Sequence, residues 1–418
     1  MIRNVKNLYH LFCAFFAALI FRYPASNLKI IGVTGTDGKT TVSHLIYEIL
    51  KQAGKRVSLV SSIKAEIGGK KYDTGFHVTT PNSWLLQKFL RKAVDRGIEY
   101  IILETTSHAL DQHRVFGIPY EIGVLTNVTH EHLDYHQTYE NYLKTKLKLL
   151  KRAKKAIVNR EDESYFEITK LRNNEIAKKK IISYGIVRGD ITSHNFRFTT
   201  PLAGEYNQSN CLAAIAVTKA LGIKDEIIKK AILGFKGIVG RFEFISTDRD
   251  LKIIVDFAHT PNALENVLKT LRPIVEGKLI HVFGCAGLRD KSKRPIMGGI
   301  SAKYADLIIL TEEDCRTEDV NEIIKEIETG INKKIKNKKL KIKNTCLPAG
   351  TAYKKLKILK IPDRQKAINK AIKLAGRGDL VLLTGKGHER SLCRGKKECL
   401  WSEHEAVKQA LHLKSFKS

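Results

Sequence analysis

The stretch Leu28–Ala53 constrains the fold of this 418-residue chain more than any other segment. It begins with a short apolar run rich in β-branched residues, which is typical of a buried parallel strand. A glycine-containing turn and a helix follow. Gly35 and Gly38 let the backbone turn tightly, so that successive N–H groups point inward at one anion. The stretch therefore predicts a strand, an anion-binding loop and a helix.

The residues that follow these glycines identify the anion as a nucleotide phosphate. Lys39 supplies a point charge, and Thr40 or Thr41 places a hydroxyl where Mg²⁺ would bind, at the positive end of the helix. Val33 stands where the usual phosphate loop has its first glycine. An ordinary glycine turn that caps a helix is the alternative. Because the motif and its predicted strand–loop–helix context agree, we favour a nucleoside triphosphate cradle.

The length and charge of the chain limit the remaining possibilities. A chain of 418 residues exceeds one ordinary core, which predicts two or three domains. The net charge of +30 comes mostly from scattered lysines without interleaved aromatic residues, so we expect no nucleic-acid partner. Seven cysteines without a CxxC pair argue against a zinc ribbon or disulfide framework and indicate a reducing, cytoplasmic setting.

An apolar run at residues 8–21 follows Arg3 and Lys6 near the N-terminus. This layout resembles a signal peptide, but the run is too short for a helix that spans a membrane. We expect residues 1–27 to form a helical segment that packs on the first domain or contacts a membrane surface peripherally. Pro24 and Ser26 are predicted to end the helix.

Polar residues follow several predicted strands at their carboxyl ends, where α/β sheets bind ligands. The strand 99–103 runs into Glu104, which we predict binds Mg²⁺ directly or through water. The alternative for this acid is a helix cap or a solvent-facing side chain. The strand 122–125 leads to a loop at 126–136 with three histidines, whose spacing matches no trusted zinc motif. A helix from 139 to about 154 follows.

The second half of the chain repeats the alternation of strands and helices. The segment 235–240 contains two glycines and predicts a hinge between domains. Strands are predicted at 253–257, 279–283, 306–310 and 380–384, with helices between them. The sequence thus predicts an α/β protein with a mostly parallel central P-loop ATPase domain and a smaller, doubly wound, Rossmann-like C-terminal domain. The predicted boundaries are 1–27, 28–240 and 241–418.

Ten motifs in order make the chain resemble the Mur ligase family, and within it the enzymes that add the third residue to UDP-N-acetylmuramoyl-dipeptide. They cover the chain from about residue 28 to the C-terminus. The motifs are TGTDGKTT (34–41), TTP (79–81), ETTSHALDQHRV (104–115), TNVTHEHLDYH (126–136), GEYNQSN (204–210), GRFE (240–243), VDFAHTPNAL (255–264), FGCAGLRDKSKRPIM (283–297), EDCRTED (313–319) and GKGHE (385–389).

The resemblance implies ATP-dependent amide formation through an acyl phosphate, with Mg²⁺ as cofactor, in peptidoglycan precursor synthesis. A diamino acid would be added, with meso-diaminopimelate favoured over L-lysine. Its substrates would be small molecules, and we expect a monomer. The resemblance assigns catalysis to Lys39, Glu104, His132 and Lys146, the last as a carbamate. It assigns the metal to Thr40, Glu104, His132 and Lys146.

The resemblance also distributes the binding residues over three groups. ATP would be held by Gly35, Thr36, Asp37, Gly38, Lys39, Thr40, Thr41, Asn207, Arg241, Asp256 and His259. The acceptor peptide and sugar would be held by Thr79, Thr80, Thr106, Gln112 and Arg114. The incoming amino acid would be held by Arg289, Glu313, Asp314, Arg316, Gly385 and Glu389, since arginine suits a carboxylate and glutamate suits a second amine.

The chain departs from the family pattern in three places. We expect the N-terminal UDP-binding domain to be absent, because 27 residues precede the first strand. Glu131 replaces the family's aspartate before His132. The loop Asp-Asn-Pro-Arg of diaminopimelate-adding enzymes is here Glu313-Asp314-Cys315-Arg316. A folylpolyglutamate-type ligase, a ligase with another acceptor, a nucleotide-binding partner subunit and a nucleic-acid-stimulated ATPase are the alternatives.

Overall fold

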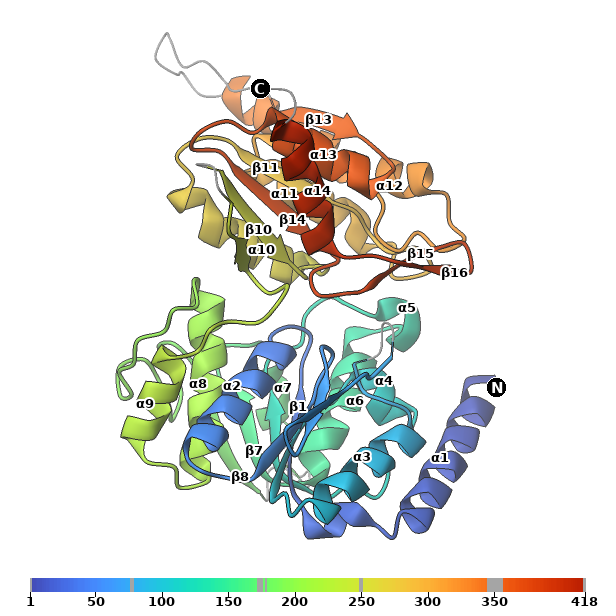
Figure 1. The fold of residues 1–418 in the computed structure, drawn as a ribbon, viewed down its shortest axis with the longest axis vertical. Coiled ribbons are helices and arrows are strands. Elements are labelled where there is room, and N and C mark those ends of the chain that lie inside the picture. Colours follow the sequence, from blue (N-terminus) through green and yellow to red (C-terminus); the bar gives the residue numbers. More distant parts are fainter. Residues whose placement is uncertain are drawn as a thin grey trace. The chain divides into compact units, whose positions relative to one another are not determined.

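The computed structural model describes residues 2–75, 79–170, 176, 179–247, 251–343 and 356–415. These residues form two compact units, shown in Figure 1. The first unit comprises Met1–Thr129 and His136–Lys236, and the second comprises His130–Tyr135 and Gly237–Ser418. The second unit therefore includes a short segment from the first half of the chain.

The first unit is built on an eight-stranded sheet in the order β4-β3-β2-β5-β1-β6-β7-β8. The six neighbouring strands β2, β5, β1, β6, β7 and β8 pair in parallel in that order, while β3 and β4 add an antiparallel edge beside β2. The strands are β1 (Lys29–Thr34), β2 (Val57–Val60), β3 (Ala65–Ile67), β4 (Lys70–Tyr72), β5 (Tyr100–Glu104), β6 (Tyr120–Leu125), β7 (Ala153–Asn159) and β8 (Lys180–Tyr184).

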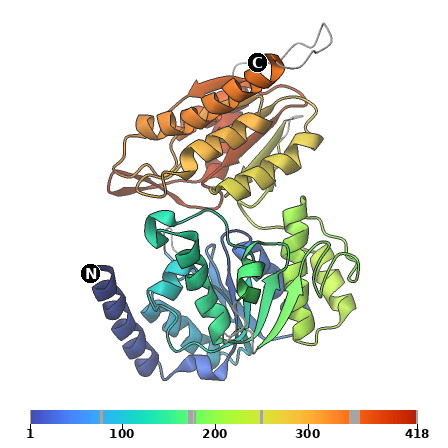
Figure 2. The same ribbon diagram turned by 180° about the vertical axis from the view of Figure 1, so that it is seen from behind.

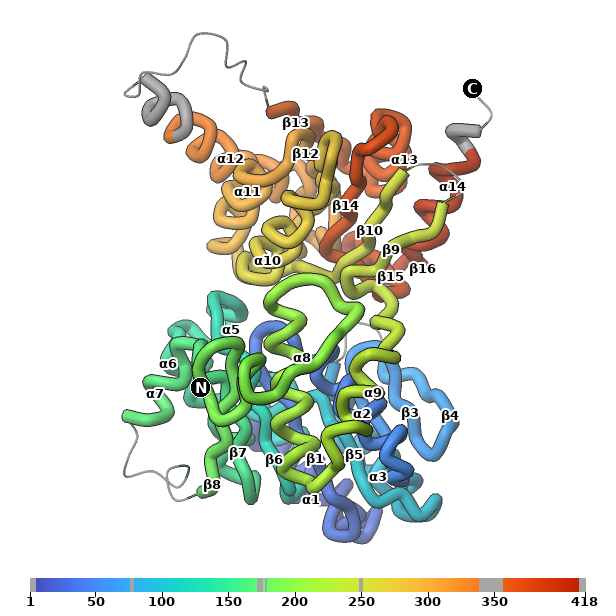
Figure 3. Tube along the Cα trace, turned by 90° about the vertical axis from the view of Figure 1, so that its left-hand side faces the viewer, coloured from blue at the N-terminus to red at the C-terminus, as the bar shows by residue number. Residues whose placement is uncertain are grey.

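Helices cover both faces of this sheet. In the tube view α2 and α8 lie side by side (Figure 3), while α3, α4 and α6 contribute side chains to the core on the other face. The helices of this unit are α1 (Ile2–Ile20), α2 (Lys39–Gln52), α3 (Ser83–Asp95), α4 (Ser107–Asp111), α6 (Tyr139–Arg152), α7 (Ser164–Lys170), α8 (Glu205–Ala220) and α9 (Asp225–Leu233). The short helix α5 (Leu133–His136) begins in the segment that groups with the second unit. Pro24–Asn27 form a 3₁₀ turn.

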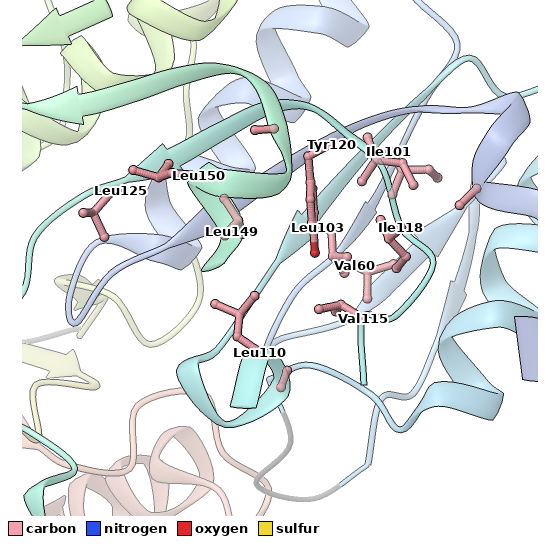
Figure 4. Close-up of a cluster of buried hydrophobic side chains, with 14 of the residues drawn as sticks. Val60, Ile101, Leu103, Leu110, Val115, Ile118, Tyr120, Leu125, Leu149 and Leu150 are labelled. Atoms are coloured by element: carbon pink, nitrogen blue, oxygen red, sulfur yellow. The ribbon is translucent and has the colours of Figure 1, made fainter. Parts of the chain in front are cut away.

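The core of the first unit follows from the apolar strands that the sequence predicts. Figure 4 shows Tyr120 of β6 among side chains of β5 together with Leu110 of α4 and Leu149 of α6. The three side chains of the run at 30–33, those of Ile30, Ile31 and Val33, are inaccessible to solvent. Each such fully buried aliphatic side chain contributes about 1.5–3 kcal/mol to folding. The strand that the sequence predicts before Gly35 is β1, which lies in the interior of the eight-stranded sheet between β5 and β6.

The predicted N-terminal helix exists and packs on the first unit. Helix α1 contacts α3, and Asn7 Nδ2 donates to Asp111 Oδ2 at 3.1 Å. The prediction that Pro24 and Ser26 end this helix is wrong. The helix ends at Ile20, where Arg22 and Tyr23 adopt left-handed backbone conformations with φ of 60° and 45°. Pro24 then starts the 3₁₀ turn.

The peripheral membrane contact predicted for residues 8–21 stays a prediction. Helix α1 exposes apolar side chains such as Phe12 and Phe16, of which half or more of the surface is accessible. Across the residues that the structure describes, no helix combines the length and the apolar character needed to cross a membrane.

The second unit repeats the α/β pattern on a six-stranded sheet in the order β13-β12-β11-β14-β10-β9. Its strands pair in parallel except for β9, which pairs antiparallel with β10. The strands are β9 (Glu243–Ile245), β10 (Lys252–Asp256), β11 (Leu279–Phe283), β12 (Leu307–Leu310), β13 (Lys357–Lys360) and β14 (Leu380–Thr384), with a separate hairpin of β15 (Ser391–Arg394) and β16 (Lys397–Leu400).

Five helices of the second unit enclose this sheet. Helices α10, α11 and α12 pack on one another, as the view from behind shows (Figure 2), and α13 and α14 cover the core of the opposite face. Their bounds are α10 (Pro261–Leu271), α11 (Lys293–Tyr304), α12 (Val320–Lys343), α13 (Arg364–Leu374) and α14 (Glu403–Ser415), and Arg272–Ile274 form a 3₁₀ turn.

Candidate functional site

The phosphate loop has the geometry that its two glycines predict. Gly35 and Gly38 have φ of 153° and 81°, which L side chains rarely adopt. A Cβ on Gly35 would lie 1.7 Å from Thr126 Oγ1, and one on Gly38 would lie 2.3 Å from Asn210 Oδ1. Gly38 is the N-cap of α2, so the free N–H groups of that helix open at the loop. Any side chain at either glycine would distort the loop.

Two lysines meet at the carbonyl of Gly35. Lys39 Nζ donates to the carbonyls of Gly35 and Thr36 at 3.1 and 2.7 Å. Lys146 Nζ donates to the same Gly35 carbonyl at 2.6 Å and lies 4.3 Å from the centroid of the Tyr142 ring. Lys146 is buried, unlike an ordinary surface lysine. The structure therefore places Lys146 against the phosphate loop.

Thr40 and Glu104 form a buried cluster of oxygen atoms beside the loop. Thr40 Oγ1 donates to Glu104 Oε1 at 3.0 Å, and the Ser62 N–H donates to Glu104 Oε2 at 3.0 Å. Hydroxyl and carboxylate oxygens are the donors that Mg²⁺ prefers, and Mg²⁺ usually takes one or two carboxylates with substrate phosphates and water. The donor set fits Mg²⁺. In the described part of the chain no three His, Cys, Asp or Glu side chains form a metal cluster.

The remaining loop residues surround this cradle. The Asp37 N–H donates to Asn127 Oδ1 at 2.9 Å, and Thr126 Oγ1 donates to the Asp37 carbonyl at 2.7 Å. Thr36 is buried, and Thr41 lies in the first turn of α2. Asn207 joins through Asn210, which donates to Asn207 Oδ1 at 3.2 Å.

His132 lies in the segment that groups with the second unit. Its Nδ1 is 3.8 Å from Glu131 Oε1, and its backbone has a φ of 58°. Lys293 Nζ contacts both carboxylate oxygens of Glu131, at 3.1 and 3.2 Å, and donates to the carbonyl of His259 at 2.8 Å. Both side chains of this ion pair are almost fully buried. Glu131, the departure from the family's aspartate, is thus the buried partner of Lys293.

The residues predicted to hold the acceptor form a connected patch in the first unit. Thr80 Oγ1 donates to the Glu104 carbonyl at 3.0 Å, and the Thr106 N–H donates to Thr80 Oγ1 at 3.0 Å. Arg114 donates to the Thr80 carbonyl at 3.2 Å and to the side chain of Gln112. Thr79 precedes this network. The patch lies directly beside Glu104, and its role in acceptor binding stays a prediction.

The predicted nucleotide residues of the second unit gather after β10. The Asp256 carboxylate accepts from the backbone N–H groups of Phe242 and Ala258, each at 2.6 Å. The Arg241 guanidinium lies 4.4 Å from the centroid of the Phe257 ring, and His259 Nδ1 is 2.9 Å from the Phe257 carbonyl. The Arg241 guanidinium thus makes a cation–π contact with the Phe257 ring, and the role of these residues in nucleotide binding stays a prediction.

The residues predicted to bind the amino acid meet in the second unit. Arg316 Nη1 donates to the Gly287 carbonyl at 2.5 Å. Burial and the nearby positive charge of Arg316 lower the pKa of Arg289. Two guanidinium groups close together favour a bound carboxylate. Asp314 and Glu389 both contact the ammonium of Lys386, and a Cβ on Gly385 would lie 2.7 Å from Glu313 Oε2.

Glu313 is the carboxylate with the most perturbed environment in this loop cluster. It is buried, and its Oε2 has no hydrogen-bond partner. Burial raises its pKa to about 7, helped by the charges of Asp314 and Glu389 and opposed by Lys293 and Lys386. Near neutral pH its carboxyl is therefore part protonated.

We expect Glu313→Gln to make the second unit more stable than wild type above pH 7. A carboxyl whose pKa rises from 4.5 to about 7 on folding binds more protons when folded, so the free energy of unfolding falls as pH rises between these values. The difference approaches about 3 kcal/mol above pH 7 and vanishes below pH 4. Urea unfolding from pH 4 to 8 measures it, with the exposed Glu322→Gln as control. Equal pH slopes for wild type and Glu313→Gln would contradict it.

Sequence reasoning missed the buried cations of the second unit. Lys293, Lys386 and Arg364 are each less than 5% exposed and ion-paired with carboxylates. Lys293 lies in the motif at 283–297 and Lys386 in the motif at 385–389. Membership of these motifs was the sequence signal that could have identified them. Asn127, which contacts Asp37, lies inside the motif at 126–136, whereas Ser62, which contacts Glu104, carries no pattern that distinguishes it.

Comparison with known proteins identifies the family to which this chain belongs. The model of the Mur ligase middle domain matches residues 33–218, and that of the Mur ligase glutamate ligase domain matches residues 240–387. The chain belongs to the Mur ligase family, whose members are ATP-dependent ligases that form carbon–nitrogen bonds.

Curated relatives narrow the position of the chain within this family. It is 35% identical over 417 residues to UDP-N-acetylmuramoyl-L-alanyl-D-glutamate–2,6-diaminopimelate ligase 1 of Clostridium acetobutylicum, with 95% of this chain and 80% of the relative covered. It is 38% identical to the ligase of the same name from a Nostoc species, with 96% and 80% covered. The family that the motifs indicate is confirmed.

Solved structures agree in fold. A structure of UDP-N-acetylmuramoyl-L-alanyl-D-glutamate–2,6-diaminopimelate ligase matches with a TM-score of 0.58 and 29% identity, covering 94% of this chain and 81% of that one. Folylpolyglutamate synthase of Mycobacterium tuberculosis, complexed with ADP and AMPPCP, matches with a TM-score of 0.68 and 14% identity over 98% and 95% of the two chains. The latter likeness is one of fold alone.

Proposed function

We propose that the chain joins 2,6-diaminopimelate to UDP-N-acetylmuramoyl-L-alanyl-D-glutamate at the expense of ATP. The observation that carries this proposal is the 35–38% identity, over 95% or more of the chain, to relatives with that activity in their name. The buried Thr40–Glu104 pair beside an intact phosphate loop supports it. We propose a monomer that acts in the cytoplasm, where ATP and the nucleotide-linked precursors are made.

The reaction proceeds in two chemical steps. An oxygen of the acceptor carboxylate attacks the γ-phosphorus of ATP, so that ADP leaves and an acyl phosphate forms. The neutral amine of the amino acid then attacks the acyl carbon, and inorganic phosphate leaves as the amide forms. The protein contributes mainly by positioning the reactants and neutralising charge.

Residues of the first unit would bind the triphosphate. The N–H groups at the start of α2 and the Lys39 ammonium would contact phosphate oxygens, for which Lys39 exchanges its present carbonyl partners. Thr40 and Glu104 would hold Mg²⁺, which when bound neutralises phosphate charge. A carbamate on Lys146 is proposed as a further ligand, since it would convert a buried cation into an anion, and so is His132, which belongs to the second unit.

Residues of the second unit would bind the amino acid. Arg289 and Arg316 would donate hydrogen bonds to a carboxylate, and Glu389 would bind an ammonium group. A diamino acid with two carboxylates suits this distribution better than L-lysine. Lysine remains the second candidate, because Cys315 replaces the proline of the loop that diaminopimelate-adding enzymes carry.

Phosphate release from ATP tests the proposal directly. Purified protein with Mg²⁺ receives UDP-N-acetylmuramoyl-L-alanyl-D-glutamate together with meso-diaminopimelate, L-lysine or no amino acid. We expect release only when the acceptor and diaminopimelate are both present. Release with L-lysine instead would assign the lysine activity. Failure of the UDP substrate to stimulate release with either amino acid would contradict the proposal, and folate with glutamate would then be tested as substrates.

A further inference from the structure

Lys386 is a buried cation at the centre of the second unit's ligand loops. It lies between β14 and β15, and its side chain has no solvent-accessible surface. Its Nζ donates to Asp314 Oδ1 at 2.8 Å and also contacts Glu389 Oε2. Removing this charge from water is costly, and the two carboxylates compensate. Burial lowers the pKa of Lys386, but the two carboxylates outweigh burial and raise this pKa above its ordinary value.

The contacts of Lys386 join loops that are far apart in the sequence. Asp314 Oδ1 also accepts from the Cys393 N–H at 2.9 Å, and the Asp314 carbonyl accepts from the Gly287 N–H at 2.7 Å. The Arg316 N–H donates to the Cys393 carbonyl at 3.0 Å. Asp314 therefore links these loops: its carboxylate contacts Lys386 and strand β15, and its backbone carbonyl contacts the loop that contains Gly287.

The charges of Lys386, Asp314 and Glu389 indicate what this cluster can bind. Asp314 and Glu389 contact the same ammonium, so they lie close to each other. Without the cation, the buried carboxylate of Asp314 and the partly buried carboxylate of Glu389 would repel each other, which favours one shared proton. Lys386 offsets one of these two negative charges, so the trio with ionised carboxylates carries one net negative charge. One negative charge is complementary to one ammonium group of a diamino acid.

We infer that Lys386 is a positioning residue for the incoming diamino acid, which keeps Asp314 and Glu389 adjacent and ionised so that Glu389 receives the ammonium. Lys386 acts through these carboxylates and does not touch the substrate, since its Nζ is already bound by both. This inference rests on the proposed function, because it concerns the site of the same amino acid.

Steady-state kinetics with Lys386→Met tests the inference. We expect the KM for meso-diaminopimelate to rise about tenfold or more, with the KM for ATP within about twofold of wild type. Because the two carboxylates of the variant would share a proton, the ratio of its diaminopimelate KM to that of wild type at the same pH is expected to fall between pH 6.5 and 8.5. Lys386→Arg keeps the charge and is expected to keep the KM within about threefold. The exposed Lys397→Met is the matched control.

The outcomes separate the inference from the proposed function. If wild type releases no phosphate with either amino acid, the proposed function fails. If wild type is active but Lys386→Met leaves the diaminopimelate KM unchanged, or raises it equally at every pH, the inference is overturned. A rise in the diaminopimelate KM of Lys386→Arg equal to that of Lys386→Met also overturns the inference. Lys386→Gln, which loses the charge but keeps a donor, replaces Lys386→Met should that variant not fold.

Discussion

Lys39→Ala is expected to lower ATP-dependent ligase activity by about a thousandfold or more. Lys39 is the ammonium that follows the phosphate loop, and its present partners are two loop carbonyls, at 3.1 and 2.7 Å. Bound triphosphate offers this charge stronger partners than neutral carbonyls, and the transferring phosphoryl group needs it most in the transition state. Phosphate release with both substrates at saturation measures the loss in kcat.

The control for this variant lies on the same helix. Lys51 is an exposed lysine in the last turn of α2, and Lys51→Ala should retain activity within about twofold. Thermal unfolding of Lys39→Ala should match wild type within a few degrees, because the lysine is not part of the core. An active Lys39→Ala protein would contradict the proposed role of the phosphate loop.

Arg364→Met is expected to destabilise the second unit by about 3–5 kcal/mol. The Arg364 guanidinium is fully buried and donates to Glu403 Oε1 at 2.7 Å, to the Glu312 carbonyl at 3.1 Å and to the Thr384 carbonyl at 2.8 Å. Methionine fills similar space but leaves Glu403 buried without its cation. For a unit of this size, the midpoint of thermal unfolding should fall on the order of 10 °C.

The two tryptophans allow this change to be followed in one unit. Trp84 lies in the first unit and Trp401 in the second, next to Glu403, so fluorescence in a Trp84→Phe background reports on the second unit alone. Exposed Lys373→Met on the same helix is the control. Pairing Arg364→Met with Glu403→Leu should recover most of the loss. A midpoint like that of the control would contradict the role of this ion pair.

Long apolar strands and glycine motifs made much of the fold predictable. The strand before Gly35 and the helix after Lys39 lie within one residue of their expected positions, because both periodicity and motif constrain them. Strands β7 and β8 were not predicted. The first carries lysines at its start, and the second combines an exposed lysine with partly buried isoleucines, so neither shows a continuous apolar run. The hairpin β15–β16 was missed for the same reason.

The site was predictable where a residue type alone defines its chemistry. Glu104 follows a parallel strand, and the structure joins it to Thr40 as strand-end geometry requires. The partners that orient such residues were not predictable, because contacts such as that of Ser62 with Glu104 depend on folding across 42 positions of sequence. Buried ion pairs such as Lys293 with Glu131 span 162 positions and leave no local pattern.

The segment His130–Tyr135 makes the two units inseparable by a single cut. A fragment that starts at Gly237 would contain every strand of the second sheet but would lack Glu131. Lys293 would then remain in the interior without its carboxylate, a loss of the same kind as breaking a buried ion pair. The second unit therefore depends on an acidic residue from the first half of the chain. Expressing the chain in two halves would remove the counterion of Lys293 from the C-terminal half.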